Sequence, residues 1–154
     1  MGGPEPARAL ETASPQATED AAAALAATLR PGDVVLVAGD LGAGKTTFVR
    51  GAARALGVTG AVTSPTFTIG RRHRTADGGW VSHLDLYRLA GLEGEDPALL
   101  ADYLTADAVA FVEWPEIADP GLLGEGVRIA ARVRLEHAGG DHRRVTIERV
   151  EADG

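Results

Sequence analysis

A glycine-rich stretch between an apolar run and an amphipathic segment limits what this chain can fold into. DVVLVAG, residues 33–39, holds a continuous apolar run of strand length, which is typical of a strand buried on both faces of a sheet. The loop GDLGAGKTTFVRG follows at once, and KTTFVRGAARAL, residues 45–56, has apolar side chains at helical spacing, with Gly57 as a C-terminal cap. Strand, glycine loop and helix in this order predict a P-loop NTPase-like α/β domain.

The loop fits the phosphate-binding pattern G-x-x-x-x-G-K-(S/T). Several backbone N–H groups must curl around phosphate oxygens, and a side chain at Gly42 or Gly44 would block that approach. Lys45 then reaches the β and γ phosphates, the Thr46 hydroxyl ligates Mg²⁺, and the helix N-terminus adds its partial positive charge. The predicted nucleotide-binding residues of the loop are Gly39, Gly42, Ala43, Gly44, Lys45, Thr46 and Thr47.

Lys45 is the only lysine among 15 basic residues. In a chain that uses arginine for every other positive charge, a single lysine in a glycine loop indicates that a compact ammonium group is required there. A guanine-reading GTPase would normally carry an Asn-Lys-x-Asp element, and the sequence contains no asparagine and no second lysine. A standard GTPase is therefore not expected, and neither is a transporter ATPase, which needs its signature segment and a longer chain.

Composition indicates one soluble domain. A chain of 154 residues is near the length of a single domain, no apolar run approaches the roughly 20 residues of a membrane span, and no cysteine is present. The formal charge of −7 argues against a surface that coats nucleic acid, because phosphate backbones attract net positive fields. We expect a cytoplasmic protein that does not insert into membranes and contacts RNA only locally or through a partner.

Two acids end apolar segments farther along the chain: Glu113 in AVAFVEWPE and Asp85 in WVSHLDLYR. A phosphate-loop site needs an acid at the end of a neighbouring strand, which holds Mg²⁺ or its waters and can orient a nucleophile. Ligand sites of α/β sheets lie at the carboxyl ends of strands, which predicts that Glu113 lies within reach of Thr46. The four histidines have no metal-ligand spacing, and we expect them to be structural.

The remaining elements complete the expected domain. Residues 1–13 are expected to be a disordered lead-in and 14–150 the folded domain, in which a helix runs from Thr18, as N-cap, to a stop at Pro31-Gly32. VTSPTFTIG and WVSHLDLYRL are predicted strands joined by RRHRTADGG, whose Asp-Gly-Gly end is a turn signal, and DPALLADYL is a predicted short helix. SPTFT places hydroxyl side chains beside a proline-fixed turn. It is a candidate switch segment, whose conformation depends on whether a γ-phosphate is bound.

The tail predicts an antiparallel hairpin. VRIAARVRL alternates, and RRVTIERV pairs with it across AGGD. One face is expected to carry Val127, Ile129, Ala131, Val133 and Leu135, and the other Arg128, Arg132 and Arg134. The predicted fold is a mixed sheet flanked by helices and closed by this hairpin.

Four stretches in this order, GDLGAGKTTFVRG, TSPTFTI, HLDLYRL and VEWPE, resemble the bacterial TsaE family, the ATPase of tRNA threonylcarbamoyladenosine biosynthesis. The resemblance runs from about Thr18 to Glu116, and the closing hairpin matches the family in kind. It implies a small P-loop fold that binds ATP or ADP and holds Mg²⁺ with Thr46 and Glu113. It also implies the partners TsaD and TsaB, which transfer a threonylcarbamoyl group to tRNA, so that tRNA is contacted only through the complex.

The resemblance assigns further roles. Asp85 matches the acid associated with hydrolysis, Lys45 would neutralise the phosphates, and Thr66 lies in the first switch-like segment. The stretch around Ser14 and the basic hairpin near Arg143 and Arg144 are where family members approach the nucleotide. LAGLEGEDPALLADYL departs from the acidic segment typical of the family. The predicted catalytic residues are Asp85, Lys45 and Glu113, and which of the two acids orients the attacking water is left open.

Two other functions remain open on the sequence alone. A compact P-loop small-molecule kinase would use RRHRTADGG as an arginine-bearing lid. A nucleotide-sensing binding module would carry the same loop and never hydrolyse ATP. Steady phosphate release in the presence of partners would exclude the second of these.

Overall fold

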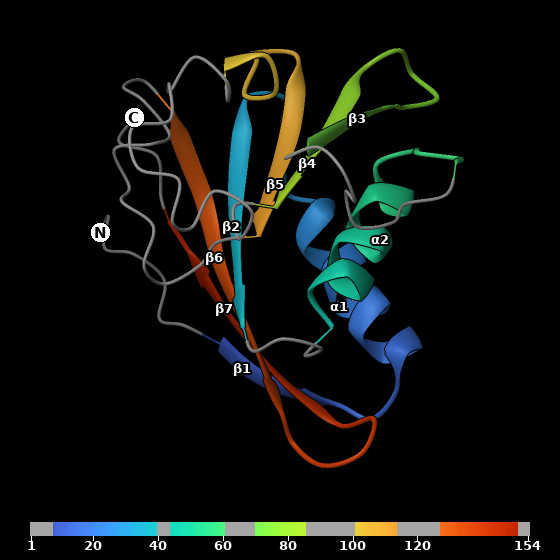
Figure 1. Ribbon diagram of the computed structural model, residues 1–154, viewed down its shortest axis with the longest axis vertical. Helices are drawn as coiled ribbons and strands as arrows, with labels where there is room; N and C mark the ends of the chain where they lie inside the picture. The colour runs from blue at the N-terminus through green and yellow to red at the C-terminus, as the bar shows by residue number, and fades with distance from the viewer. Residues whose placement is uncertain (1–7, 40–43, 61–69, 86–100, 114–126, 151–154) are drawn as a thin grey trace.

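The computed structural model describes residues 8–39, 44–60, 70–85, 101–113 and 127–150, which build one seven-stranded sheet and helices α1 and α2 (Figure 1). The strands are β1 Arg8–Thr12, β2 Asp33–Gly39, β3 Gly70–Arg74, β4 Trp80–Asp85, β5 Ala108–Glu113, β6 Arg128–His137 and β7 Arg143–Arg149. The helices are α1 Pro15–Ala26 and α2 Lys45–Ala55. Within the described part, no helix is long and apolar enough to cross a membrane.

The sheet is mixed, with strand order β1-β7-β6-β2-β5-β4-β3. The four central strands β6, β2, β5 and β4 are parallel, and antiparallel pairs add β3 at one edge and β7 and then β1 at the other. The predicted mixed sheet and its C-terminal hairpin, β6–β7, are thereby confirmed. Because parallel strands share their direction, the carboxyl ends of the four central strands meet at one edge of the sheet.

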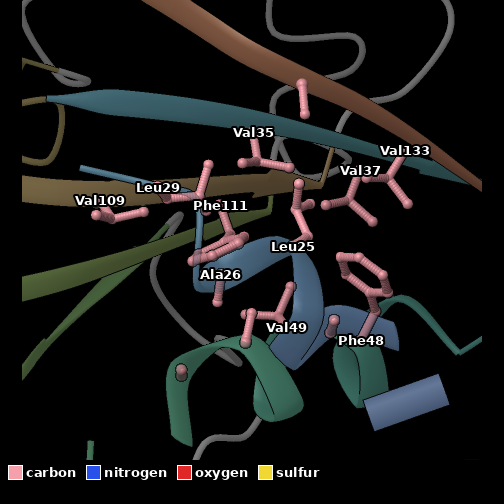
Figure 2. Packing of buried hydrophobic residues seen from close by; sticks show 14 of the residues in the cluster. Leu25, Ala26, Leu29, Val35, Val37, Phe48, Val49, Val109, Phe111 and Val133 are labelled. Atoms are coloured by element: carbon pink, nitrogen blue, oxygen red, sulfur yellow. The ribbon is translucent and has the colours of Figure 1, made fainter. Parts of the chain in front are cut away.

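Both helices lie on the same side of the sheet and pack against each other (Figure 1). Figure 2 shows Val35 and Val37 of β2 facing Phe48 and Val49 of α2 and Leu25 of α1 in the main core. A smaller cluster covers the opposite face of the central strands and contains Val34, Leu36, Leu84, Ala110 and Val112. The two clusters explain why β2 and β5 are apolar without interruption, as the sequence predicted: both of their faces are buried.

Helix α1 begins earlier than predicted. Ser14, not Thr18, is its N-cap, and the Ser14 Oγ accepts a hydrogen bond of 3.1 Å from the backbone N–H of Ala17. Pro15 occupies the first helical position, where its fixed φ suits a helix. The N–H that proline lacks costs nothing there, because the first N–H groups of a helix have no acceptor within the helix. Thr18 is buried instead, with its hydroxyl 2.7 Å from that of Thr12. The helix ends at Ala26, before the predicted stop at Pro31-Gly32.

Two segments that were predicted to be irregular are strands. Arg8–Thr12, expected in a disordered lead-in, forms β1 and pairs with β7. Arg71–Arg74, expected in a connection, lies in β3 and pairs with β4, whereas the predicted Asp-Gly-Gly turn is confirmed. Both strands are mostly exposed and polar, so pairing with a neighbour rather than an apolar pattern holds them in place. Residues 62–69 and most of DPALLADYL lie outside the described residues.

The predicted alternation of β6 is wrong at its start. The register shifts between Val34, which pairs with Ile129, and Val35, which pairs with Ala131, so Ala130 is an extra residue in a bulge. Val127 and Ile129 therefore pack on the face opposite the helices, and Ala131, Val133 and Leu135 pack on the helix side. A one-residue shift exchanges the faces of a strand, and the sequence pattern alone did not reveal it.

Gly51 allows α2 to pack closely against α1, and Gly51→Ala should destabilise the fold. A Cβ at this buried position would lie 2.5 Å from both the Cα and the backbone oxygen of Glu19 in α1. Overpacking of this kind costs about 1–3 kcal/mol, although alanine favours a helix over glycine. The measurement is the free energy of unfolding in urea. Gly60→Ala is the control, because a Cβ there meets nothing within 4 Å; equal stability of the two variants would contradict the account.

Candidate active site

Three neighbouring parallel strands end together at one edge of the sheet. β2 ends at Gly39, β5 at Glu113 and β4 at Asp85. Glu113 pairs in register with Val37 on one side and with Asp85 on the other. Both predicted acids therefore lie at the edge from which the chain leaves β2 for the glycine loop. Glu113 is on the strand next to β2 and Asp85 is on the strand beyond it. Ligand sites of α/β sheets use this edge.

Glycines shape the chain at both ends of the loop. A Cβ at Gly39 would lie 2.4 Å from the backbone oxygen of Leu135 in β6, so only glycine fits this approach. Gly44 has a left-handed φ of 97° and is the N-cap of α2, where a glycine has no side chain to cap the first turn. The backbone N–H groups of that turn point toward the N-terminal end of the helix and carry the positive end of its dipole.

Lys45 is buried, with an exposed fraction of 7%. Its Nζ donates a hydrogen bond of 2.9 Å to the backbone oxygen of Gly39, so the ammonium group reaches back across the loop from α2 to the end of β2. Thr46 and Thr47 follow in the first turn of α2 and are partly exposed. A cation and two hydroxyl side chains thus lie at the N-terminus of one helix, directly after the loop.

The N-terminal part of the chain reaches the same edge through the β1–β7 pair. Thr12 pairs with Arg143, and a Cβ at Gly44 would lie 3.9 Å from the Nε of Arg143. The hairpin arginine therefore lies beside the N-terminus of α2. Ser14 follows Thr12 directly, and its hydroxyl caps α1, so its contact with a nucleotide stays a prediction.

Glu113 has a buried partner that the sequence analysis treated only as structural. The Nε2 of His83 lies 2.6 Å from the Oε2 of Glu113, with side-chain exposures of 0% and 5%. Asp85, two residues beyond His83 on the same side of β4, is partly buried. The spacing H-x-D in a strand places both side chains on one face, and this signal, combined with the strand order, would have linked His83 to the acids.

The donors at this edge suit Mg²⁺ bound with a nucleotide. Among the residues that the structure describes, no group of three His, Cys, Asp or Glu side chains could form an all-protein metal cage. Mg²⁺ usually takes one or two protein oxygens and completes its shell with phosphates and water, so the Thr46 hydroxyl and the Glu113 carboxylate fit it. Burial lowers the pKa of His73 in β3, and His83 and Arg71 lower it further.

Three predicted nucleotide-binding residues fall outside the described residues. Gly42 and Ala43 belong to the middle of the loop, and Thr66 belongs to the segment SPTFT. Their roles stay predictions. The described part of the site consists of the two ends of the loop, the first turn of α2, and the ends of β4 and β5.

A family model for threonylcarbamoyl adenosine biosynthesis protein TsaE matches residues 12–145, from the end of β1 into β7. The chain belongs to the TsaE family. The resemblance predicted from four short motifs is confirmed, and the match to the family also includes β6, which the motifs did not reach.

Individual TsaE proteins match over most of their length. The tRNA threonylcarbamoyladenosine biosynthesis protein TsaE of Streptomyces coelicolor is 47% identical over 118 residues, which are 76% of this chain and 77% of that protein. The protein of the same name from Bacillus subtilis is 40% identical over 140 residues, 90% of this chain and 84% of that protein. The crystal structure of Bacillus subtilis YdiB matches with a TM-score of 0.69 and 32% identity, over 98% of this chain and 90% of that one.

Proposed function

We propose that this TsaE-family protein is a Mg²⁺-dependent, ATP-binding and ATP-hydrolysing subunit that supports the TsaB–TsaD transferase in threonylcarbamoyladenosine modification of tRNA. One observation carries the proposal: a buried lysine, the N-terminus of α2 and two strand-end acids meet at the edge of the sheet where β2 enters the glycine loop. This combination is suited to bind a nucleoside triphosphate together with its metal ion. The family membership supplies the pathway.

Each residue has a role in this proposal. The loop glycines let backbone N–H groups reach the phosphates, and Lys45 neutralises the charge that builds up on the β and γ phosphates. Thr46 and Glu113 would hold Mg²⁺, which when bound screens phosphate charge. Asp85 is placed next to Glu113 and can orient a water for hydrolysis. The nucleotide contacts are Ser14, Gly39, Gly42, Ala43, Gly44, Lys45, Thr46, Thr47 and Thr66.

The kinase alternative loses its main support, because the segment proposed as a lid is part of the sheet. Arg71–Arg74 pairs with β4 along its length. The guanidinium carbons of Arg72 and Arg74 lie 4.5 and 5.1 Å from the ring centroid of Trp80, and Arg72 also donates to Asp107 over 3.3 Å. Arginines held in this way do not form a lid that closes over a small acceptor.

The proposed function is tested by phosphate release from ATP. The purified chain is assayed with Mg²⁺ alone, with the TsaB–TsaD pair, and with the pair and tRNA. We expect slow release by the chain alone and several-fold faster release with the pair. The Lys45→Ala variant serves as the control for contaminating ATPases and should release no phosphate under any of these conditions.

Each other outcome points to a different function. Release that the pair does not accelerate contradicts the subunit role. Consumption of ATP only after a small acceptor is added, with a phosphorylated product, supports a kinase. Tight ATP binding without hydrolysis in any mixture supports a nucleotide-sensing module.

A further inference from the structure

The geometry points to His83 as the residue that positions the Glu113 carboxylate for Mg²⁺, an inference that rests on the proposed function. The Nε2 of His83 and the Oε2 of Glu113 are 2.6 Å apart, and both side chains are buried between the sheet and the helices. The bond joins Glu113, the last residue of β5, to His83, which lies two residues before the end of β4. His83 does not itself reach the ligand in this proposal; it acts through Glu113.

The hydrogen-bond partners of the two ring nitrogens indicate that His83 donates from Nε2 to Glu113. Among the described residues, His83 Nδ1 has no hydrogen-bond partner. A proton on Nδ1 would therefore be a buried donor without an acceptor, and an Nε2 without a proton would set a lone pair against a carboxylate oxygen. A proton on Nε2, donated to the Oε2 of Glu113, avoids both of these costs.

A purely structural role does not account for the choice of residue. The other fully buried side chains on this face of β4 and β5 are apolar, among them Val81 and Phe111. An imidazole in such a place needs a polar partner, and the partner that it has is the acid assigned to Mg²⁺. Holding Oε2 on His83 removes freedom from a flexible glutamate and leaves Oε1 for the ion. Partners that orient a ligating carboxylate typically contribute roughly 10- to 100-fold to metal affinity.

The test measures ATP affinity as a function of Mg²⁺ concentration with a fluorescent ATP analogue, in the full-length chain. His83→Leu keeps the volume and removes the donor. We expect its half-saturating Mg²⁺ concentration to rise roughly 10- to 100-fold, while its affinity for nucleotide in EDTA is unchanged. His83→Gln places an amide nitrogen near the position of Nε2 and should restore most of the Mg²⁺ response.

Two further variants separate this effect from loss of stability. Val81→Ala truncates a fully buried side chain on the same face of β4, so it should lower the melting temperature without changing the Mg²⁺ response. His83→Asn keeps a polar side chain, but its amide nitrogen corresponds to Nδ1 and does not reach Oε2. It should behave as His83→Leu does, and it replaces that variant if the leucine chain does not fold.

The outcomes distinguish failure of the proposed function from failure of the positioning role of His83. A wild-type chain whose ATP affinity does not respond to Mg²⁺ overturns the proposed function, whatever the variants do. A normal wild-type response together with a normal response in His83→Leu or His83→Asn overturns the positioning role alone. A His83→Gln chain as impaired as His83→Leu also overturns it, because the donor would then be irrelevant.

Discussion

Replacing Lys45 by alanine should abolish the thermal stabilisation that ATP and Mg²⁺ give the wild-type chain. A ligand at about 100 times its Kd stabilises the folded state by about 2.7 kcal/mol. For a domain of this length that corresponds to about 5–11 °C in Tm. Lys45 supplies the only side-chain ammonium of the whole sequence and already reaches Gly39 at the end of β2, so the variant should show a shift close to zero.

The comparison has to be made within each variant. The ammonium Nζ of Lys45 donates to the backbone oxygen of Gly39, so its removal also costs the nucleotide-free protein about 1.5–3 kcal/mol. The quantity that tests the role of Lys45 is therefore the difference in Tm with and without ATP, measured by differential scanning fluorimetry. A shift of wild-type size in Lys45→Ala would refute the assignment of the loop as the nucleotide site.

Two further variants define what Lys45 contributes. Lys45→Arg keeps the positive charge but replaces a compact ammonium by a wider planar group, and we expect it to lose most of the ATP shift. Arg54→Ala removes one cation from the exposed side of the same helix, where its ion pair with Glu19 is long, at 3.4 Å. This second variant should keep the full shift, because exposed ion pairs of this kind contribute little.

The central strands and α2 were predictable from sequence because the spacing of their apolar residues is compatible with only one kind of secondary structure. The apolar run of β2 requires burial on both faces, and the apolar spacing of α2 requires one buried stripe, so their bounds follow closely. The edge strands β1 and β3 were not predictable, because their residues are polar and only the partners β7 and β4 make them strands. The bulge at Ala130 likewise depends on pairing with β2.

The site was predictable where it is local in sequence and only partly where it is assembled by the sheet. The glycine loop and Lys45 lie in one continuous motif, and the two acids were found because each ends an apolar strand. The register that sets Asp85 beside Glu113 follows from the strand order β2-β5-β4, which no single segment encodes. His83 was missed because a lone histidine without ligand spacing acquires meaning only from the strand next to it.

Glu113→Gln should abolish the effect of Mg²⁺ on ATP binding while the fold stays intact. Glutamine has nearly the same volume as glutamate and keeps an oxygen that can accept from His83, but it lacks the negative charge that a divalent ion requires. Titration calorimetry with ATP, in EDTA and in excess Mg²⁺, should give one affinity in both buffers for the variant and two different affinities for the wild type.

Glu113→Ala separates the charge of this residue from its structural part. It should also lose the Mg²⁺ effect, but it leaves the buried Nε2–H of His83 without an acceptor, which costs about 1–3 kcal/mol. The alanine variant should therefore melt well below the glutamine variant, although the two respond to Mg²⁺ alike. Equal melting temperatures would mean that the 2.6 Å bond to His83 contributes nothing to stability.

Asp85→Asn is the matching variant of the second acid. It removes a negative charge from β4, next to Glu113 in β5. If Glu113 holds the ion and Asp85 serves hydrolysis, Asp85→Asn keeps the Mg²⁺-dependent affinity of the wild type and loses phosphate release with the TsaB–TsaD pair. The reverse result, a lost Mg²⁺ effect in Asp85→Asn and a normal one in Glu113→Gln, would exchange the two roles. The physical reason to expect the first result is burial: Glu113 is held in one orientation by His83 and lies next to β2, where α2 and Thr46 begin, whereas Asp85 is one strand farther away and more exposed.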